Sequence, residues 1–181
     1  MGFGFEGKRI RLVPLDPDKH LDNVYAWVND CDVTDTLGFR GTPMSRASEQ
    51  EWMERIGKDP NNIVWAIELL DGTHIGTSGI HNINLTNGVA NTGSFIGVSN
   101  LHGQGYGTEA SVLRARYGFH VLGLRMLKST HLGGNHASRR MLEKTGYAEY
   151  GRIPGEHWKN GVFHDMVYML LTKEKFLELH P

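Results

Sequence analysis

The sequence predicts a mixed α+β fold, in which a mostly antiparallel sheet of about seven strands carries flanking helices. Strand-like segments dominate the centre of the chain, where Asp71-Gly72 and Asn87-Gly88 are hairpin signals. Strand-like and helix-like segments then alternate, which indicates one parallel crossover inside the sheet. The 181 residues, of which 39% are hydrophobic, fit one domain over residues 1–181 with a buried core.

The first part of the chain is expected to contribute two helices and four strands. Arg9–Leu15 alternates apolar and polar residues, as a first strand would. Asp16-Pro17 starts a helix whose apolar residues recur at helical spacing as far as Val28. Ser48-Glu49-Gln50-Glu51 is a capping box, which predicts a second helix ending near Gly57. Three further strands are expected over residues 63–69, 74–83 and 92–98.

Helices alternate with strands in the second part. The apolar residues at 110, 113, 117 and 121 share one helical stripe, which predicts a helix over Thr108–Leu122. A short strand over Leu127–Leu132 precedes a helix over Asn135–Thr145, and Gly146 closes that helix. The last strands are expected over residues 147–153 and 163–171.

Charge and cysteine content exclude some classes of protein. The formal net charge is −1, whereas binding of nucleic acid needs a concentrated basic face. No apolar run is long enough to span a bilayer, and the N-terminus lacks the pattern of a signal peptide, so no membrane association is expected. The single cysteine, Cys31, falls at an expected helix end and cannot form an internal disulfide. A reducing, cytoplasmic setting is therefore expected.

Three glycines alternate at positions 103, 105 and 107, between a predicted strand and a predicted helix. Glycines let the backbone turn tightly and approach an anion, and the helix N-terminus adds partial positive charge. A diphosphate is the expected ligand. No lysine follows as in the P-loop of nucleotide hydrolases, and the dinucleotide-binding pattern would need a glycine at Thr108. A glycine-rich turn that merely starts a helix is the alternative.

Longer segments around this loop resemble one family. Ile96-Gly97 followed by Leu101–Ala110 closely resembles the acetyl-CoA loop of the GNAT superfamily of N-acetyltransferases, and Asn135–Tyr147 is similar to its next motif. Further segments resemble the branch of ribosomal-protein N-terminal (alanine/serine) acetyltransferases, namely 11–15, 151–152 and 161–169. The sequence departs from the family at His102, where Gln or Arg is usual. It departs again at Leu142, where many members carry a Tyr that protonates the leaving thiolate.

The resemblance implies that the strand before the loop and the strand after its helix are parallel and splay apart, with acetyl-CoA bound between them. It also implies a set of acetyl-CoA contacts from the first strand, the loop and the later helix. These candidates are Phe95, Ile96, Val98, His102, Gly103, Gln104, Gly105, Tyr106, Gly107, Thr108, Asn135, Ser138 and Arg139. No metal site is expected, because His131 and His136 lack a third ligand.

The implied activity is acetyl transfer from acetyl-CoA to a primary amine, with a protein N-terminal amine as the leading acceptor. A small amine, such as an aminoglycoside or polyamine, is one alternative, and a catalytically silent CoA-binding module is another. A homodimer is the family-level expectation for assembly.

The acid and the base of the reaction are less evident from the sequence. Asn91–Ser94, where relatives of this family place a glutamate base, holds no acid. This favours either an α-amine of pKa near 8, because a lysine-type amine costs about 4.6 kcal/mol to deprotonate at pH 7, or a water relayed from a distant base. Ser138 is the candidate that assists the leaving thiolate, and His131 is the candidate base. Helix capping and a strand-end hydrogen bond are their respective structural alternatives.

Overall fold

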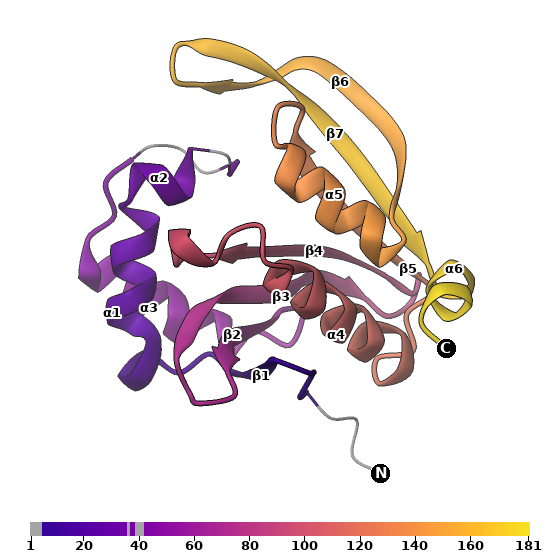
Figure 1. Cartoon of the computed structure of the whole chain (residues 1–181), viewed down its shortest axis with the longest axis horizontal. Helices are drawn as coiled ribbons and strands as arrows, with labels where there is room; N and C mark the ends of the chain where they lie inside the picture. Colours follow the sequence, from indigo (N-terminus) through magenta and orange to yellow (C-terminus); the bar gives the residue numbers. More distant parts are fainter. Residues whose placement is uncertain (1–4, 36, 39–41) are drawn as a thin grey trace.

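The computed structural model describes residues 5–35, 37–38 and 42–181. Its centre is one seven-stranded sheet, which helices cover (Figure 1). The strands are β1 (Ile10–Pro14), β2 (Ile63–Leu69), β3 (His74–Asn84), β4 (Val89–Ile96), β5 (Met126–Leu132), β6 (Ala148–Lys159) and β7 (Val162–Thr172). The helices are α1 (Pro17–Val28), α2 (Cys31–Thr34), α3 (Arg46–Ile56), α4 (Tyr106–His120), α5 (His136–Thr145) and α6 (Lys173–Leu179), with a 3-10 turn η1 (Ser99–Leu101).

The strand order is β1-β2-β3-β4-β5-β7-β6, and every neighbouring pair is antiparallel except β4 and β5. These two parallel strands pair over only three residues of each and part beyond Asn91 and Lys128. Side chains then bridge the opening, since Ser129 Oγ donates to the Thr92 carbonyl and Thr92 Oγ1 donates to the Lys128 carbonyl, each at 3.0 Å. The predicted fold class, including the splayed parallel pair, is confirmed.

Local signals account for the first helix. Asp16 caps α1 by accepting the Asp18 amide, and Pro17 occupies the first turn, as predicted. The predicted start of the second helix was wrong, because α3 begins at Arg46 with Ser45 as its cap. Ser48, taken for the cap in the sequence, instead donates its amide to Ser45 Oγ at 3.1 Å.

Other boundaries also differ from the prediction. Cys31 does not end a helix; it begins α2, which Asp30 caps, and its thiol is free and exposed. β4 runs from residue 89 to 96 rather than from 92 to 98, because it pairs with β3 from the turn onward, and Val98 lies outside it. α4 begins at Tyr106, two residues early, because Gly105 already takes the cap position. Val121, placed on the buried stripe by the sequence, is 45% exposed just after the helix ends.

The C-terminal region holds more structure than expected. β6 extends to Lys159 and β7 to Thr172, and together they form a long hairpin that projects past the rest of the sheet in Figure 1. α6 was not predicted; Thr172 caps it and Phe176 anchors it against Phe119, with ring centroids 5.3 Å apart.

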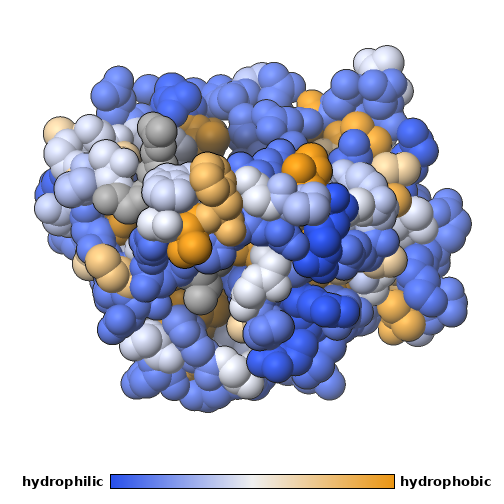
Figure 2. Space-filling model, turned by 90° about the horizontal axis from the view of Figure 1, so that it is seen from above, coloured by the Kyte–Doolittle hydropathy of each residue, from blue (hydrophilic) through white to orange (hydrophobic). Residues whose placement is uncertain are grey.

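The main core lies between the sheet and α4, which packs across β1, β3, β4 and β5. Leu142 is fully buried in this core, which explains an aliphatic side chain at that position. Seen from above, the surface is mostly hydrophilic, and hydrophobic residues form small separate groups (Figure 2). Within the described residues, no helix has the length and apolar character needed to cross a membrane.

Candidate functional site

The glycine loop ends at the N-terminus of α4. Gly103 and Gly105 have φ values of +74° and +89°, a region that favours glycine. Gly105 is the helix cap, and no side chain caps α4. The backbone amides in the first turn of this 15-residue helix therefore have no capping side chain as a hydrogen-bond acceptor. Helix N-termini that bind anions usually leave these amides open in this way. A cavity of about 260 Å³ adjoins the loop, between the end of β4 and the start of α5.

Side chains outside the loop hold it in place. Arg9, just before β1, donates its amide and Nε to the two carboxylate oxygens of Glu109 at 2.9 and 3.0 Å. The same guanidinium donates to the Gln104 carbonyl at 2.9 Å and lies 4.6 Å from the centre of the Tyr106 ring. His102 Nε2–H donates to the Ile96 carbonyl at 2.7 Å, which fastens the loop to the end of β4. Arg9 was missed in the sequence, where nothing linked it to residues about a hundred positions away.

The start of α5 faces the same cavity. Asn135 Oδ1 caps the helix by accepting the Ser138 amide at 2.9 Å, and both residues line the cavity. Arg139 turns away to pair with Glu143 at 2.8 Å, whereas Arg140 lines the cavity. The structure thus gathers Ile96, Asn135, Ser138 and the loop residues other than Gln104 around this cavity. Three of the predicted contacts, namely Val98, Gln104 and Arg139, do not line it.

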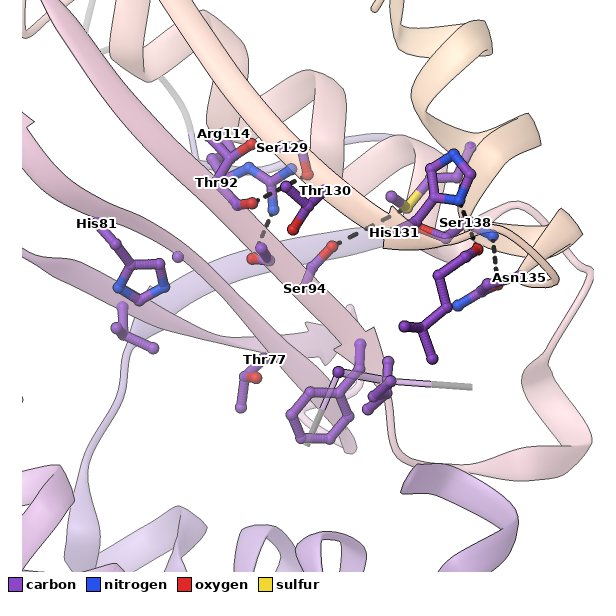
Figure 3. Close-up of a pocket in the computed structure, with 18 of the residues that line it drawn as sticks. Thr77, His81, Thr92, Ser94, Arg114, Ser129, Thr130, His131, Asn135 and Ser138 are labelled. Atoms are coloured by element: carbon purple, nitrogen blue, oxygen red, sulfur yellow. Dashed lines mark hydrogen bonds between the residues drawn. The ribbon is translucent and has the colours of Figure 1, made fainter. Parts of the chain in front are cut away.

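A second cavity of about 420 Å³ opens at the splay of β4 and β5 (Figure 3). Ser94, Phe95, Asn135, Ser138 and Met141 line both cavities, so the two adjoin there. Its other polar lining residues come from β3, β4, α4 and β5, and they are Thr77, His81, Thr92, Arg114, Ser129, Thr130 and His131. Among the described residues, no aspartate or glutamate lines this cavity.

Arg114 is the charged residue of this lining. It is 0% exposed and donates to Ser78 Oγ at 3.0 Å, the Gly93 carbonyl at 2.7 Å and Ser111 Oγ at 3.2 Å. Burial lowers the pKa of the guanidinium, and Tyr147 opposes that shift. No carboxylate of the described residues pairs with it, and its buried Nε has no partner there. The sequence held a signal that was missed: position 114 lies four residues after Ala110, on the buried stripe.

The two histidines of this cavity differ in their surroundings. His131 is 5% exposed; its Nδ1–H donates to the Leu132 carbonyl at 2.8 Å, and its buried Nε2 has no partner in the described chain. His81 is only partly buried, and its Nδ1 lies 3.1 Å from Asn62 Oδ1. Burial and, secondly, the charge of Arg114 lower the pKa of His81. Sequence reasoning had not identified His81.

Nothing in the described part of the chain resembles a metal centre: residues 5–35, 37–38 and 42–181 hold no cluster of three or more His, Cys, Asp or Glu side chains suited to a metal ion. The hydrogen-bonding groups of the two cavities are instead backbone amides, hydroxyls, an asparagine, histidines, arginines and a lysine, Lys144.

Comparisons with known proteins agree with this geometry. The family model described as acetyltransferase (GNAT) domain matches residues 9–148. A Bacillus subtilis (strain 168) protein named "Putative ribosomal N-acetyltransferase YdaF" is 32% identical over 108 residues, which are 60% of this chain and 58% of that relative; the match thus spans less than two thirds of it.

Two solved structures share the fold. Spermidine N-acetyltransferase from Vibrio cholerae, solved in complex with CoA and spermine, superposes with a TM-score of 0.87 at 19% identity, covering 94% of this chain and 99% of that one. A GCN5-related N-acetyltransferase from Brucella melitensis gives a TM-score of 0.78 at 26% identity, covering 97% of this chain and 81% of the other.

Proposed function

Because the chain belongs to the GNAT acetyltransferase family, we propose that residues 1–181 act as one domain that transfers an acetyl group from acetyl-CoA to a primary amine. One observation carries this proposal: the cavity beside the glycine loop and the cavity that opens at the splay adjoin at Ser94, Phe95 and Ser138. A cosubstrate on one side and an acceptor on the other can therefore meet between β4 and β5.

The loop residues fit a diphosphate and the splay fits an extended chain. Gly103 and the residues from Gly105 to Thr108 line the cavity at the start of α4, and their amides are our candidates to hold the diphosphate, with Arg140 adding a positive charge at the same cavity. Beyond Asn91, β4 has no backbone pairing with β5, so the backbone of Phe95 and Ile96, together with Val98 just after the strand, is our candidate for hydrogen bonds to pantetheine. When bound, acetyl-CoA supplies an acetyl thioester at the splay.

Ser138 is our candidate for proton donation to the departing thiolate. Its side chain lines both cavities, and its amide is used by the Asn135 cap, which fixes its place on the first turn of α5. The demand on this group is small, because a thiol of pKa about 8.5 is already a fair leaving group. A Tyr at position 142 is not needed for this role, and Leu142 belongs to the core.

The charge of the acceptor cavity favours an α-amine, with a protein N-terminal amine as the leading class. A polyamine carries several positive charges, which carboxylates would ordinarily balance. Here the described lining offers no carboxylate, and the buried Arg114 places a positive charge behind β4. A neutral peptide N-terminus meets no such repulsion.

Release of free thiol from acetyl-CoA tests the proposal against four acceptors. These are a peptide with a free N-terminus, the same peptide with a blocked N-terminus and an internal lysine, spermidine and an aminoglycoside. We expect the free N-terminus to react at least tenfold faster than the other three. Preference for spermidine or the aminoglycoside would overturn the choice of acceptor. CoA binding without thiol release from any acceptor would show a silent binding module.

We also propose a homodimer in a reducing, cytoplasmic setting. The β6–β7 hairpin exposes Trp158, Val162 and Phe163 by 58%, 55% and 66%, and such a cluster is typical of a protein contact. Cys31 is exposed with a free thiol, which suits a reducing compartment. Light scattering should give twice the mass of one chain, and Phe163→Glu should shift the mass toward one chain. Equal masses for the wild type and for Phe163→Glu would contradict an interface at this hairpin.

A further inference from the structure

The acceptor amine must lose a proton, and β4 offers no acid to receive it. The register of β3 and β4 places His81 opposite Asn91 and Gly79 opposite Gly93. The His81 imidazole leans along its own strand, so that its Nε2 edge occupies the space that a side chain at Gly79 would need. At Gly93, a side chain would meet no atom within 4 Å. Gly79 thus makes room for the ring itself, and Gly93 leaves open space on the neighbouring strand, in the cavity that His81 lines (Figure 3).

Asn62 fixes which ring nitrogen carries the proton. Its Nδ2 donates to Asp59 Oδ2 at 2.7 Å, which turns its Oδ1 toward the Nδ1 of His81, 3.1 Å away. The Asn82 amide also donates to that Oδ1, at 3.4 Å. An amide oxygen only accepts, so His81 Nδ1 carries the hydrogen and Nε2 keeps its lone pair. This is the orientation that a base needs, with a second group holding the imidazole.

We propose that His81 is the general base of acetyl transfer and that it selects for α-amines, an inference that rests on the acetyltransferase function proposed above. The amine nitrogen forms the new bond to the acetyl carbon, and the carbon–sulfur bond breaks with its electron pair leaving on sulfur. The amine proton passes to Nε2 of His81 through water in the cavity, and the thiolate takes a proton from the Ser138 side of the site.

The electrostatic surroundings keep this base unprotonated at neutral pH. Burial lowers the pKa of His81 from its usual value of 6.5, and the Arg114 guanidinium on α4 adds to the shift. The nearby carboxylate of Asp59, in the segment before β2, reaches the ring only through Asn62. Transfer of a proton to such a base is roughly 250-fold less unfavourable from an amine of pKa near 8 than from a lysine-type amine of pKa 10.4.

His131, the candidate from the sequence, is the competing base. Its Nε2 is enclosed, with no accessible surface and no partner in the described chain. A ring nitrogen that is enclosed in this way cannot receive a proton directly from an amine in the cavity. Figure 3 shows the two rings at opposite ends of the cavity: His81 lies toward Thr77, and His131 lies beside Ser138.

The test is the pH dependence of kcat/KM for a peptide with a free N-terminus, measured on the wild type, His81→Gln, His131→Gln and His120→Gln. We expect His81→Gln to lower kcat/KM about 100-fold or more at neutral pH. Its pH profile should no longer show the ionisation of the base, and its Kd for CoA should equal that of the wild type. His120 lies at the exposed end of α4, outside both cavities, so His120→Gln should match the wild type.

Two further variants separate catalysis from folding. His81→Ala should regain part of the lost rate when imidazole is added. Gly79→Ala keeps the histidine but displaces its ring, and it should lose rate without loss of CoA affinity. The role of His81 is overturned if kcat/KM of His81→Gln stays within threefold of the wild type, or if only His131→Gln loses the ionisation of the base from its pH profile. Either result leaves the proposed acetyl transfer itself intact. Wild-type protein that releases no thiol with any amine overturns both proposals.

Discussion

At Gly105 a single residue decides both a backbone conformation and access to the anion site. Its φ of +89° is rare for other residues, and a branched side chain there is strained. The position of a Cβ would also lie 3.3 Å from the Arg9 guanidinium, which holds the loop. We predict that Gly105→Val lowers CoA affinity at least tenfold, with a strain of about 1–3 kcal/mol in the free energy of unfolding. Calorimetric titration with CoA and urea unfolding measure the two effects.

A matched glycine separates strain from obstruction. Gly123 also has a positive φ, +68°, but lies in the turn between α4 and β5, where a side chain would meet nothing within 4 Å. Gly123→Val should therefore lose similar stability and bind CoA as the wild type does. If the folded Gly105→Val protein also binds CoA normally, the glycine loop does not hold the diphosphate.

At the scale of one element, the start of α5 combines a helix cap with a proposed ligand contact. Asn135 Oδ1 caps the helix, and the resemblance assigns the same residue to pantetheine. Asn135→Ala should lower the free energy of unfolding by about 1 kcal/mol, because the cap oxygen is removed. Asn135→Asp keeps a cap oxygen and should stay close to wild-type stability, yet it loses the amide donor and should bind CoA more weakly. Urea unfolding and CoA titration of this pair decide the matter: equal CoA affinity in Asp and wild-type proteins would leave Asn135 with a structural role only.

Elements with local signals could be predicted from the sequence. Asp16-Pro17, the turns at Gly72 and Gly88, and the Gly146 cap each depend on neighbours in the chain. The start of α3 depended on a distant contact instead. Asn29, at the end of α1, exchanges two hydrogen bonds with the backbone of Met44, at 2.8 and 3.1 Å. This holds the chain extended up to Ser45, which then caps the helix in place of Ser48.

The candidate site likewise has a part that depends on local sequence and a part that depends on distant contacts. The glycine loop could be predicted because its conformation and its ligand chemistry lie within seven consecutive residues. The burial of Arg114 could have been predicted from the helical stripe, but its contacts and the position of His81 could not, since they depend on which strand carbonyl α4 approaches and on the β3–β4 register. Only the folded sheet brings Asn62 beside His81, across nineteen positions of sequence.

At the scale of the whole molecule, one buried polar cluster ties α1 to the first strands. Glu68 on β2 pairs with Arg11 on β1 at 2.7 Å and lies 3.3 Å from His20 on α1. The His20 ring lies tilted against His74 of β3, with centroids 4.6 Å apart, and the Trp27 ring also contacts His74, with centroids 4.7 Å apart. The same Trp27 fills the space beside Gly97, just after β4, so that α1 also supports the strand that leads to the loop.

This cluster makes folding sensitive to acid. Burial, and then the charge of His20, lowers the pKa of His74 from 6.5 to about 4. The unfolded chain therefore binds a proton more readily, and stability is lost as the pH falls from 6.5 toward 4, by up to about 3 kcal/mol. Glu68, whose pKa is also lowered, acts in the same direction at lower pH, whereas Glu49, whose pKa burial raises, acts in the opposite one.

The contribution of His74 to this pH dependence can be obtained by comparing the wild type with a variant changed only at His74, because Glu49 and Glu68 remain in both proteins. We predict that the free energy of unfolding, measured with urea across this pH range, falls less steeply for His74→Gln than for the wild type. His136→Gln, at an exposed position on α5, should keep the wild-type slope. The wild-type slope exceeds that of the variant only if the folded cluster holds His74 neutral, and parallel curves would place the acid sensitivity elsewhere.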